Sequence, residues 1–317
     1  MAVNLTDPIF NDEDKARAYF EEIRWPRGRI ICCHCGNVDI TRIYPIKANA
    51  AKKVRAGLYE CQDCHGQFTV RTGSVMESSH VPLTKWALAY RFMASSKKGM
   101  SAHQLHRSIG VTYKTAWFMW HRIREAMRED VMPPMGGDGK VVEADETFIG
   151  PGRYIFENDK GWRKASGPSG KRVVVTLVER GGIARSIHAD KLDAATITQI
   201  LADNVSRKSR LHTDESHLYR KPGADFAAHE RVNHSAKEYA REDVTTNTVE
   251  GFFSIFKRGM TGVYQHCGEQ HLQRYLDEFD FRYSNRAALG IDDSERTRRA
   301  IKGGDGKRLT YRPLSGA

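Results

Sequence analysis

Two aspartates stand where strand-like segments of the sequence could bring carboxylates together. Asp145 lies within the alternating stretch VVEADETFIG, and Asp214 directly follows a second strand-like run, residues 210–213. Two strand-terminal carboxylates can lie side by side at one edge of a sheet. Carboxylates from different chain segments can hold two magnesium ions about 3.5 to 4 Å apart for phosphodiester chemistry. Each aspartate alone is more often a turn former or a helix cap, so this prediction depends on their combination.

A third polar group comes from the stretch TTNTVEGFFSIFKRG. Asn247 and Glu250 are three residues apart, and Lys257 follows Glu250 by seven residues. These spacings fall on one face of a helix, and the phenylalanines between them would bury the other face. A solvated amphipathic face is the alternative interpretation. Together with the two aspartates, we interpret the stripe as part of one site in which Lys257 grips a DNA phosphate.

Four cysteines form two C-x-x-C pairs with 25 residues between them, namely Cys32, Cys35, Cys61 and Cys64. Two such knuckles supply four thiolates for a tetrahedral zinc ion. The spacing therefore predicts a structural zinc ribbon, in which metal binding replaces the core that so short a segment lacks. Free buried cysteines or a redox pair are the alternative, which the doubled motif disfavours.

A helical segment follows the cysteines. Apolar residues recur at helical spacing over 83–93, 102–109 and 113–127. The last two runs resemble a helix-turn-helix, with Gly110 at the turn, and an ordinary helical hairpin is the alternative. In a helix-turn-helix the start of the second helix faces base edges and later residues contact phosphates. The base-contact candidates are Tyr113, Lys114 and Thr115. The phosphate candidates are Arg122, with His121 and Arg124.

The site carboxylates must be positioned by a sheet. Strand-like runs cover 140–150, 171–182 and 183–190, a Gly and Ser loop separates the first two, and the Pro- and Gly-rich stretch 131–140 is a linker. A helix (194–205), another strand and a long helix beginning near Thr246 follow. Strands that alternate with helices predict a mixed α/β fold, a mixed sheet covered by helices.

Composition limits the possible partners. Fifty Lys and Arg against 39 Asp and Glu give a net charge of +11, which favours a polyanion such as nucleic acid. No apolar run reaches the length of a membrane span, and the N-terminus lacks the layout of a secretory signal. We therefore expect a cytoplasmic protein with no membrane partner.

These motifs together resemble the DDE-type transposases of bacterial insertion sequences, in the branch that carries an N-terminal zinc ribbon and is related to Merlin elements. The resemblance covers residues 25–286 through WPRG, the paired C-x-x-C, FTVRTGSVMESS, SKKGMSAHQLHRSIGVTYKTAWFMWHRIREAM, VEADETFIG, VNHS, TNTVEGFFSIFKRGMTGVY and HLQRYLDEFDFRY.

The resemblance implies an RNase H-like catalytic domain with Asp145 and Asp214 as its first two catalytic aspartates. The third position is open, because some members are described with Asn there. We favour Glu250 for its charge and its seven-residue step to Lys257, and Asn247 stays a possible ligand or support. Mg²⁺ or Mn²⁺ would bind Asp145, Asp214 and Glu250. Glu143 and Glu146, which flank Asp145, are expected to support the site or the fold.

In this family the enzyme binds terminal inverted repeats through its N-terminal modules and pairs two ends in a DNA-bound homo-oligomer. Water then attacks at the transposon end, and the freed 3′-hydroxyl attacks target DNA. The expected domains are a zinc ribbon (1–78), a helix-turn-helix (79–130), the catalytic domain (138–290) and a flexible basic tail that contacts DNA (291–317). A nucleoid-associated bacterial protein is implied. The alternatives are a DNA-binding regulator with an inert transposase-derived domain and another RNase H-like nuclease.

Overall fold

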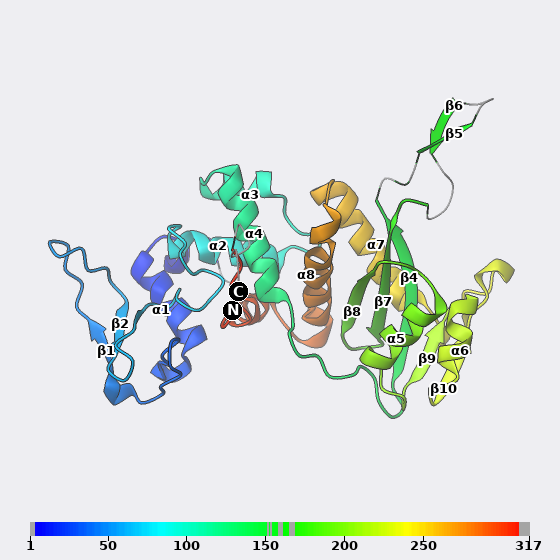
Figure 1. The fold of residues 1–317 in the computed structure, drawn as a ribbon, viewed down its shortest axis with the longest axis horizontal. Helices are drawn as coiled ribbons and strands as arrows, with labels where there is room; N and C mark the ends of the chain where they lie inside the picture. Colours follow the sequence, from blue (N-terminus) through cyan, green and yellow to red (C-terminus); the bar gives the residue numbers. More distant parts are fainter. Residues whose placement is uncertain (1–3, 151, 153, 158–160, 165–168, 311–317) are drawn as a thin grey trace. The chain divides into compact units, whose positions relative to one another are not determined.

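The computed structural model describes residues 4–150, 152, 154–157, 161–164 and 169–310. The chain divides into two compact units, residues 1–128 with 290–317 and residues 129–289 (Figure 1). The first unit contains the cysteine pairs and the predicted helices, and the second contains the predicted sheet. Within the described residues, no helix has the length and apolar character needed to span a membrane.

Helices dominate the first unit. They are α1 (Glu13–Arg24), α2 (Leu83–Ser95), α3 (Ala102–Ile109), α4 (Tyr113–Met127) and α9 (Asp293–Lys302). The side chains of Asp12, Ser101 and Thr112 accept hydrogen bonds from the first-turn amides of α1, α3 and α4, which satisfies donors that a helix start leaves open. Gly110 ends α3 with a φ of 62°, a left-handed conformation that suits glycine. The three helices predicted between residues 83 and 127 are therefore confirmed.

The cysteine pairs lie on and beside a small antiparallel sheet. Its strands, in the order β1-β2-β3, are β1 (Ile43–Ile46), β2 (Leu58–Cys61) and β3 (Gln67–Phe68). Phe68 is fully buried, and its ring packs against those of Trp25 and Tyr59. This aromatic cluster supplies the small core of the ribbon.

The flexible tail expected from residue 291 is wrong for residues 293–302, which form α9. This helix packs against α1, α2 and α4. Its Ala300 and Ile301 are buried, and the buried Arg296 guanidinium donates to the Ala94 carbonyl at 3.1 Å. The Arg-rich composition concealed a buried face at helical spacing, formed by Arg296, Thr297, Ala300 and Ile301. Residues 311–317 of the predicted tail lie outside the described residues.

A mixed five-stranded sheet forms the second unit. Its strands, in spatial order β10-β9-β4-β7-β8, are β10 (Ala228–Arg231), β9 (Arg210–Thr213), β4 (Val141–Ile149), β7 (Arg172–Glu179) and β8 (Ala184–Ala189). β4, β7 and β8 are antiparallel neighbours, whereas β9 runs parallel to both β4 and β10. This mixed α/β sheet is the RNase H-like arrangement that the resemblance implied.

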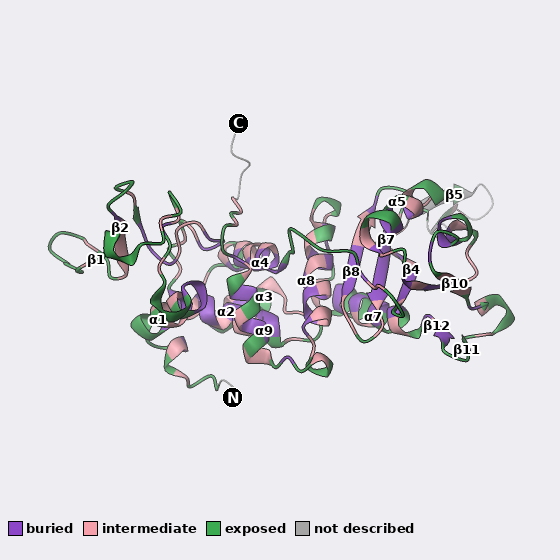
Figure 2. Cartoon of the chain, turned by 90° about the horizontal axis from the view of Figure 1, so that it is seen from below, coloured by how far each residue is buried: buried purple, intermediate pink, exposed green. Residues whose placement is uncertain are grey.

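Helices cover both faces of the sheet, and the strands β4, β7 and β8 are largely buried between them (Figure 2). The helices of this unit are α5 (Ala194–Asn204), α6 (Arg220–Gly223), α7 (Asn247–Gly259) and α8 (Leu272–Ser284). Val142 and Ala144 of β4 pack in one core with residues of α5. Val174 of β7 packs in the other core with α7 and α8. Side chains alternate between the two faces along a strand, and Thr147 of β4 pairs with Val174. The odd-numbered residues of β4 therefore face α7.

Two minor hairpins complete the unit, β11 (Ala240–Arg241) with β12 (Val244–Thr245) and β5 (Tyr154–Glu157) with β6 (Gly161–Lys164). The second hairpin lies in the stretch predicted to be a Gly and Ser loop, so that prediction is wrong for these residues. Residues 165–168 of the loop lie outside the described residues. The turn residues dominate the composition, and they concealed the short paired strands.

Candidate active site and metal centre

Asp145 lies in the middle of β4, on the face that turns toward α7. Its neighbours Val142 and Ala144 point into the opposite core and are fully buried. Successive side chains of a strand alternate between faces, so Glu143, Asp145 and Thr147 share the α7 side. The Asp145 carboxylate accepts a hydrogen bond of 2.8 Å from the Glu146 backbone amide.

Asp214 follows the end of β9, the parallel neighbour of β4. The register pairs Glu143 with His212, and continuing it by two residues places Asp214 next to Asp145. The Asp214 carboxylate accepts a 2.9 Å hydrogen bond from the Ser216 amide. The sheet register therefore brings the two aspartates of the sequence prediction together.

Helix α7 carries the third group. Its buried residues Val249, Phe252, Phe253 and Phe256 anchor it on the sheet. Glu250 and Lys257 lie beside this buried stripe and are exposed. Asn247, the first residue of α7, is also exposed, and its backbone amide donates to Thr245 Oγ1.

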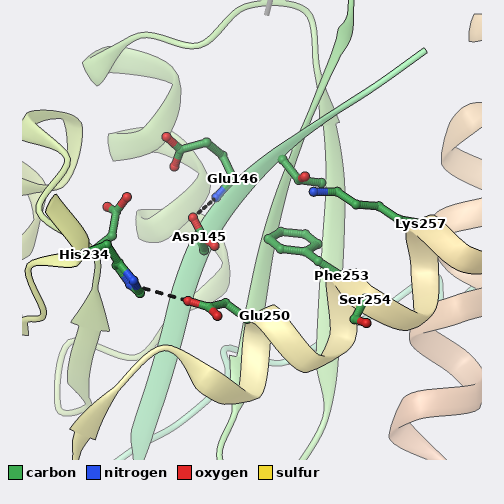
Figure 3. A pocket seen from close by; sticks show the side chains of 9 residues that line it. Asp145, Glu146, His234, Glu250, Phe253, Ser254 and Lys257 are labelled. Atoms are coloured by element: carbon green, nitrogen blue, oxygen red, sulfur yellow. Dashed lines mark hydrogen bonds and ion pairs between the residues drawn. The ribbon is translucent and has the colours of Figure 1, made fainter. Parts of the chain in front are cut away.

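These elements enclose one pocket of about 450 Å³ (Figure 3). It is lined by Asp145, Glu146, Thr147, Asp214, His234, Glu250, Phe253, Ser254 and Lys257. Four of the five residues predicted for the catalytic site therefore line the same pocket. Asn247 is not among its lining residues, which favours Glu250 for the third position.

Negative charge accumulates in this pocket. Burial, followed by the charges of Glu146 and Asp214, raises the pKa of Asp145 to about 8. Burial also raises the pKa of Asp214, with a further contribution from Glu215. Clustered carboxylates that repel one another in this way, and that offer hard oxygen donors, fit divalent cations such as Mg²⁺. In the described residues no three acidic side chains place ligand oxygens within 4.8 Å of one another.

The sequence prediction missed His234. Its Nε2 lies 3.4 Å from Glu250 Oε1 and 3.1 Å from Thr246 Oγ1 (Figure 3). Glu215 fixes the loop, since its carboxylate accepts from the backbone amides of His234 and Ser235 at 2.9 and 3.1 Å. His234 occurs within the quoted motif VNHS, and the position of this motif just after a strand was the available signal.

Glu146 lies on the other side of β4 from Asp145. Its carboxylate accepts a 2.7 Å hydrogen bond from the hydroxyl of the buried Tyr219. Burial raises the pKa of Glu146, and the Tyr219 hydrogen bond acts in the opposite direction. This anchored side chain is consistent with the supporting role expected from the sequence.

The four cysteines of the predicted zinc ribbon come together in the first unit. The Sγ atoms of Cys32, Cys35, Cys61 and Cys64 lie within 4.8 Å of one another. The Cys32–Cys64 and Cys35–Cys61 Sγ separations are both 3.7 Å. A tetrahedral site with Zn–S bonds of about 2.3 Å requires sulfur separations near ~3.8 Å. The donor set and its spacing therefore fit a zinc ion.

The candidate DNA contacts of the first unit lie on α4. Tyr113 and Lys114 are exposed and Thr115 is half-buried at its first turn. Arg122 is also half-buried, with its guanidinium over the Phe118 ring at 4.5 Å. His121 and Arg124 are each 1% exposed, so the prediction that they reach phosphates is wrong. Both residues lie on the buried side of α4, among apolar residues that are also buried.

Two family models match this chain. Residues 136–284 match the ISXO2-like transposase domain, and residues 11–67 match the transposase zinc-ribbon domain. A protein in transposable element ISH50 of Halobacterium salinarum is 28% identical over 284 residues, which cover 86% of this chain and 91% of that protein.

Among solved structures, the Mos1 strand transfer complex has a TM-score of 0.28 at 13% identity, with 71% of this chain and 79% of that chain covered. The Mos1 transposase paired-end complex with left transposon end has a TM-score of 0.29 at 12% identity, with 71% and 80% covered.

Proposed function

This chain belongs to the transposases that combine a transposase zinc-ribbon domain with an ISXO2-like transposase domain, and we propose that it cuts and joins the DNA ends of its own insertion sequence. In the first reaction water attacks the phosphodiester at the transposon end and releases a 3′-hydroxyl. In the second reaction that 3′-hydroxyl attacks a phosphodiester of target DNA, whose own 3′-oxygen leaves.

One observation carries this proposal: Asp145, Asp214 and Glu250 line one pocket although they come from β4, the end of β9 and α7. Carboxylates from three elements at one point repel one another, and a fold tolerates this arrangement where cations bind. When bound there, two divalent cations activate the attacking oxygen and stabilise the leaving oxygen.

The residues of the pocket divide the remaining tasks. Asp145, Asp214 and Glu250 are the metal ligands, and Glu250 takes the third place because Asn247 lies outside the pocket lining. Lys257 is exposed at the pocket, two helical turns beyond Glu250. Its ammonium group binds a DNA phosphate beside the cleaved bond and aligns the strand.

The first unit recognises the DNA ends. The exposed start of α4, with Tyr113, Lys114 and Thr115, contacts base edges, and Arg122 adds a phosphate contact. The cysteine cluster holds a structural zinc ion that keeps the ribbon folded. Two protomers pair the two ends of the element in a homo-oligomer on DNA.

Cleavage and strand transfer on labelled DNA that carries the element's own ends test this proposal. The protein should cut and join these ends when Mg²⁺ or Mn²⁺ is present. It should do neither when both ions are left out. Asp214→Asn should abolish cleavage and leave end binding intact or tighter, because it removes negative charge near the DNA. Binding without cleavage by the natural protein would support the DNA-binding regulator instead, and cleavage without strand transfer would support another RNase H-like nuclease.

A further inference from the structure

Glu143 is a buried charge that the proposed reaction does not use. Its side chain is fully buried in the interior of the second unit. It precedes Asp145 by two residues on β4 and shares its face, toward α7. A buried carboxylate is costly unless hydrogen bonds and opposite charge compensate it, so its partners show what holds it there.

Three of these partners belong to the first turn of α7. The Glu143 carboxylate accepts from the Thr248 amide at 2.8 Å, the Thr248 hydroxyl at 2.7 Å and the Val249 amide at 3.1 Å. The residue at the cap position, Thr246, makes no side-chain hydrogen bond to the first-turn amides. A helix start leaves its amide groups open, and here a carboxylate from the neighbouring strand satisfies them.

Arg180 completes the compensation and extends it to the segment that leads into α7. Its guanidinium donates to Glu143 Oε1 at 3.1 and 2.8 Å. It also donates to the carbonyl groups of Asp243 and Thr245 at 2.8 and 3.3 Å. The start of α7 and the chain before it are therefore both bound to one point on β4.

We propose, on the basis of the proposed function, that Glu143 is a positioning residue that sets the separation of Asp145 and Glu250. Asp145 follows Glu143 by two residues, and Glu250 follows Thr248 by two residues. The hydrogen bonds between Glu143 and Thr248 therefore lie close to both proposed metal ligands. Glu143 does not line the pocket. Paired cations need ligands placed for a spacing of about 3.5 to 4 Å, and a misplacement of about 1 Å can cost a factor of roughly 100 in rate.

Glu143→Gln in the full chain tests this role. Glutamine has nearly the same shape, but its amide nitrogen is a donor. The partners of Glu143 are donors too, so this nitrogen cannot replace the carboxylate oxygen that accepts from them. The readout is Mn²⁺ binding to zinc-loaded protein by electron paramagnetic resonance, corrected for the binding that remains in Asp145→Asn. We expect the Mn²⁺ affinity to fall by at least roughly tenfold, and the Mg²⁺ concentration for half-maximal cleavage to rise in parallel. DNA-end binding should stay within about twofold, because the fully buried Glu143 side chain is out of reach of DNA.

Asp280→Asn is the matched control. Asp280 on α8 accepts from the Ser186 amide at 2.6 Å and the Ser186 hydroxyl at 2.7 Å. It also joins a helix to the sheet, and it does not line the pocket. This variant should keep its Mn²⁺ affinity. Thr248→Val, which removes only the hydroxyl bond, provides a milder variant in case Glu143→Gln does not fold, and should weaken Mn²⁺ binding a few-fold.

Unchanged Mn²⁺ affinity in folded Glu143→Gln or in Thr248→Val would overturn the positioning role, as would an equal loss in Asp280→Asn. Absence of Mn²⁺ binding at the pocket of the natural protein would overturn it as well. If the natural protein binds Mn²⁺ and loses it in Glu143→Gln but never cuts DNA, the positioning role stands and the proposed function fails. If the natural protein cuts DNA and Glu143→Gln behaves like it, the proposed function stands and the positioning role fails.

Discussion

Replacing Asp145 by asparagine should stabilise the metal-free protein at pH 8 while it abolishes catalysis. Burial and the neighbouring carboxylates Glu146 and Asp214 raise the pKa of Asp145 to about 8. The unfolded chain ionises the same carboxyl near 3.8. The folded state therefore binds this proton more tightly than the unfolded state. The resulting stabilisation is complete below about pH 4 and is lost as the pH rises toward 8.

The size of the effect follows from the two pKa values. Each factor of ten in proton affinity corresponds to about 1.4 kcal/mol, which gives an upper limit of roughly 5 kcal/mol at pH 8. The pocket is open to solvent, and water screens the repulsion among its carboxylates, so we expect about 1 to 3 kcal/mol. For a unit of this size each kcal/mol shifts the Tm by roughly 2 to 4 °C. Asp145→Asn should therefore melt several degrees above the natural protein at pH 8.

Thermal unfolding between pH 4 and pH 8, with zinc-loaded protein and without Mg²⁺ or Mn²⁺, measures this gain. The difference between the two proteins should be small near pH 4 and should grow with pH. Asp243→Asn is a control of opposite sign, because the Arg210 hydrogen bond lowers the pKa of Asp243 and its loss destabilises the fold at neutral pH. Added Mn²⁺ should raise the Tm of the natural protein and leave Asp145→Asn unchanged. An equal or lower Tm for Asp145→Asn at pH 8 would refute the reasoning.

Three further predictions concern zinc, the pocket lysine and the DNA-binding helix. The protein should contain one zinc ion per chain by metal analysis, and Cys61→Ser should lose the ion and unfold the ribbon, because metal binding supplies its folding free energy. Lys257→Ala should slow cleavage by roughly 10- to 100-fold at an unchanged Mg²⁺ midpoint, since it loses a charge-assisted phosphate contact. Lys114→Ala should weaken binding to the element's ends more than binding to unrelated DNA of the same length, since it loses a base contact.

Each of these predictions has a result that would contradict it. Zinc-free natural protein with a folded ribbon would contradict the first. A Lys257→Ala enzyme with normal cleavage, or one whose defect is fully reversed by more Mg²⁺, would contradict the second. For the third, unchanged binding of the element's ends by Lys114→Ala would remove α4 from the DNA interface, and Lys97→Ala, a lysine before α3, provides the comparison.

Local spacing predicted those parts of the protein that local physics determines. The doubled C-x-x-C sets four sulfur atoms at zinc distances, and the cysteines do meet. The step of three residues from Asn247 to Glu250 and the step of seven from Glu250 to Lys257 predicted a helix. The structure has this helix as α7. Its phenylalanines bury one side, as an amphipathic pattern requires.

The remaining features depend on contacts between distant segments. Glu143 and Thr248 are 105 residues apart in sequence, and no local pattern indicates that one caps the helix of the other. The same holds for His234, which reaches Glu250 through a loop fixed by Glu215. The basic stretch after residue 291 looked unstructured by composition, yet Ala300 and Ile301 give it a face to bury. Such long-range contacts override the local preference of a segment.

Cleavage of end-bearing DNA by Glu250→Gln and Asn247→Ala, side by side with the natural protein, tests the assignment of the pocket most directly. Glu250 lines the pocket with Asp145 and Asp214, and Asn247 does not. We predict that Glu250→Gln binds the ends but cuts none with Mg²⁺, whereas Asn247→Ala still cuts and joins them. Normal cleavage by Glu250→Gln, or loss of cleavage in Asn247→Ala alone, would contradict this account of the site.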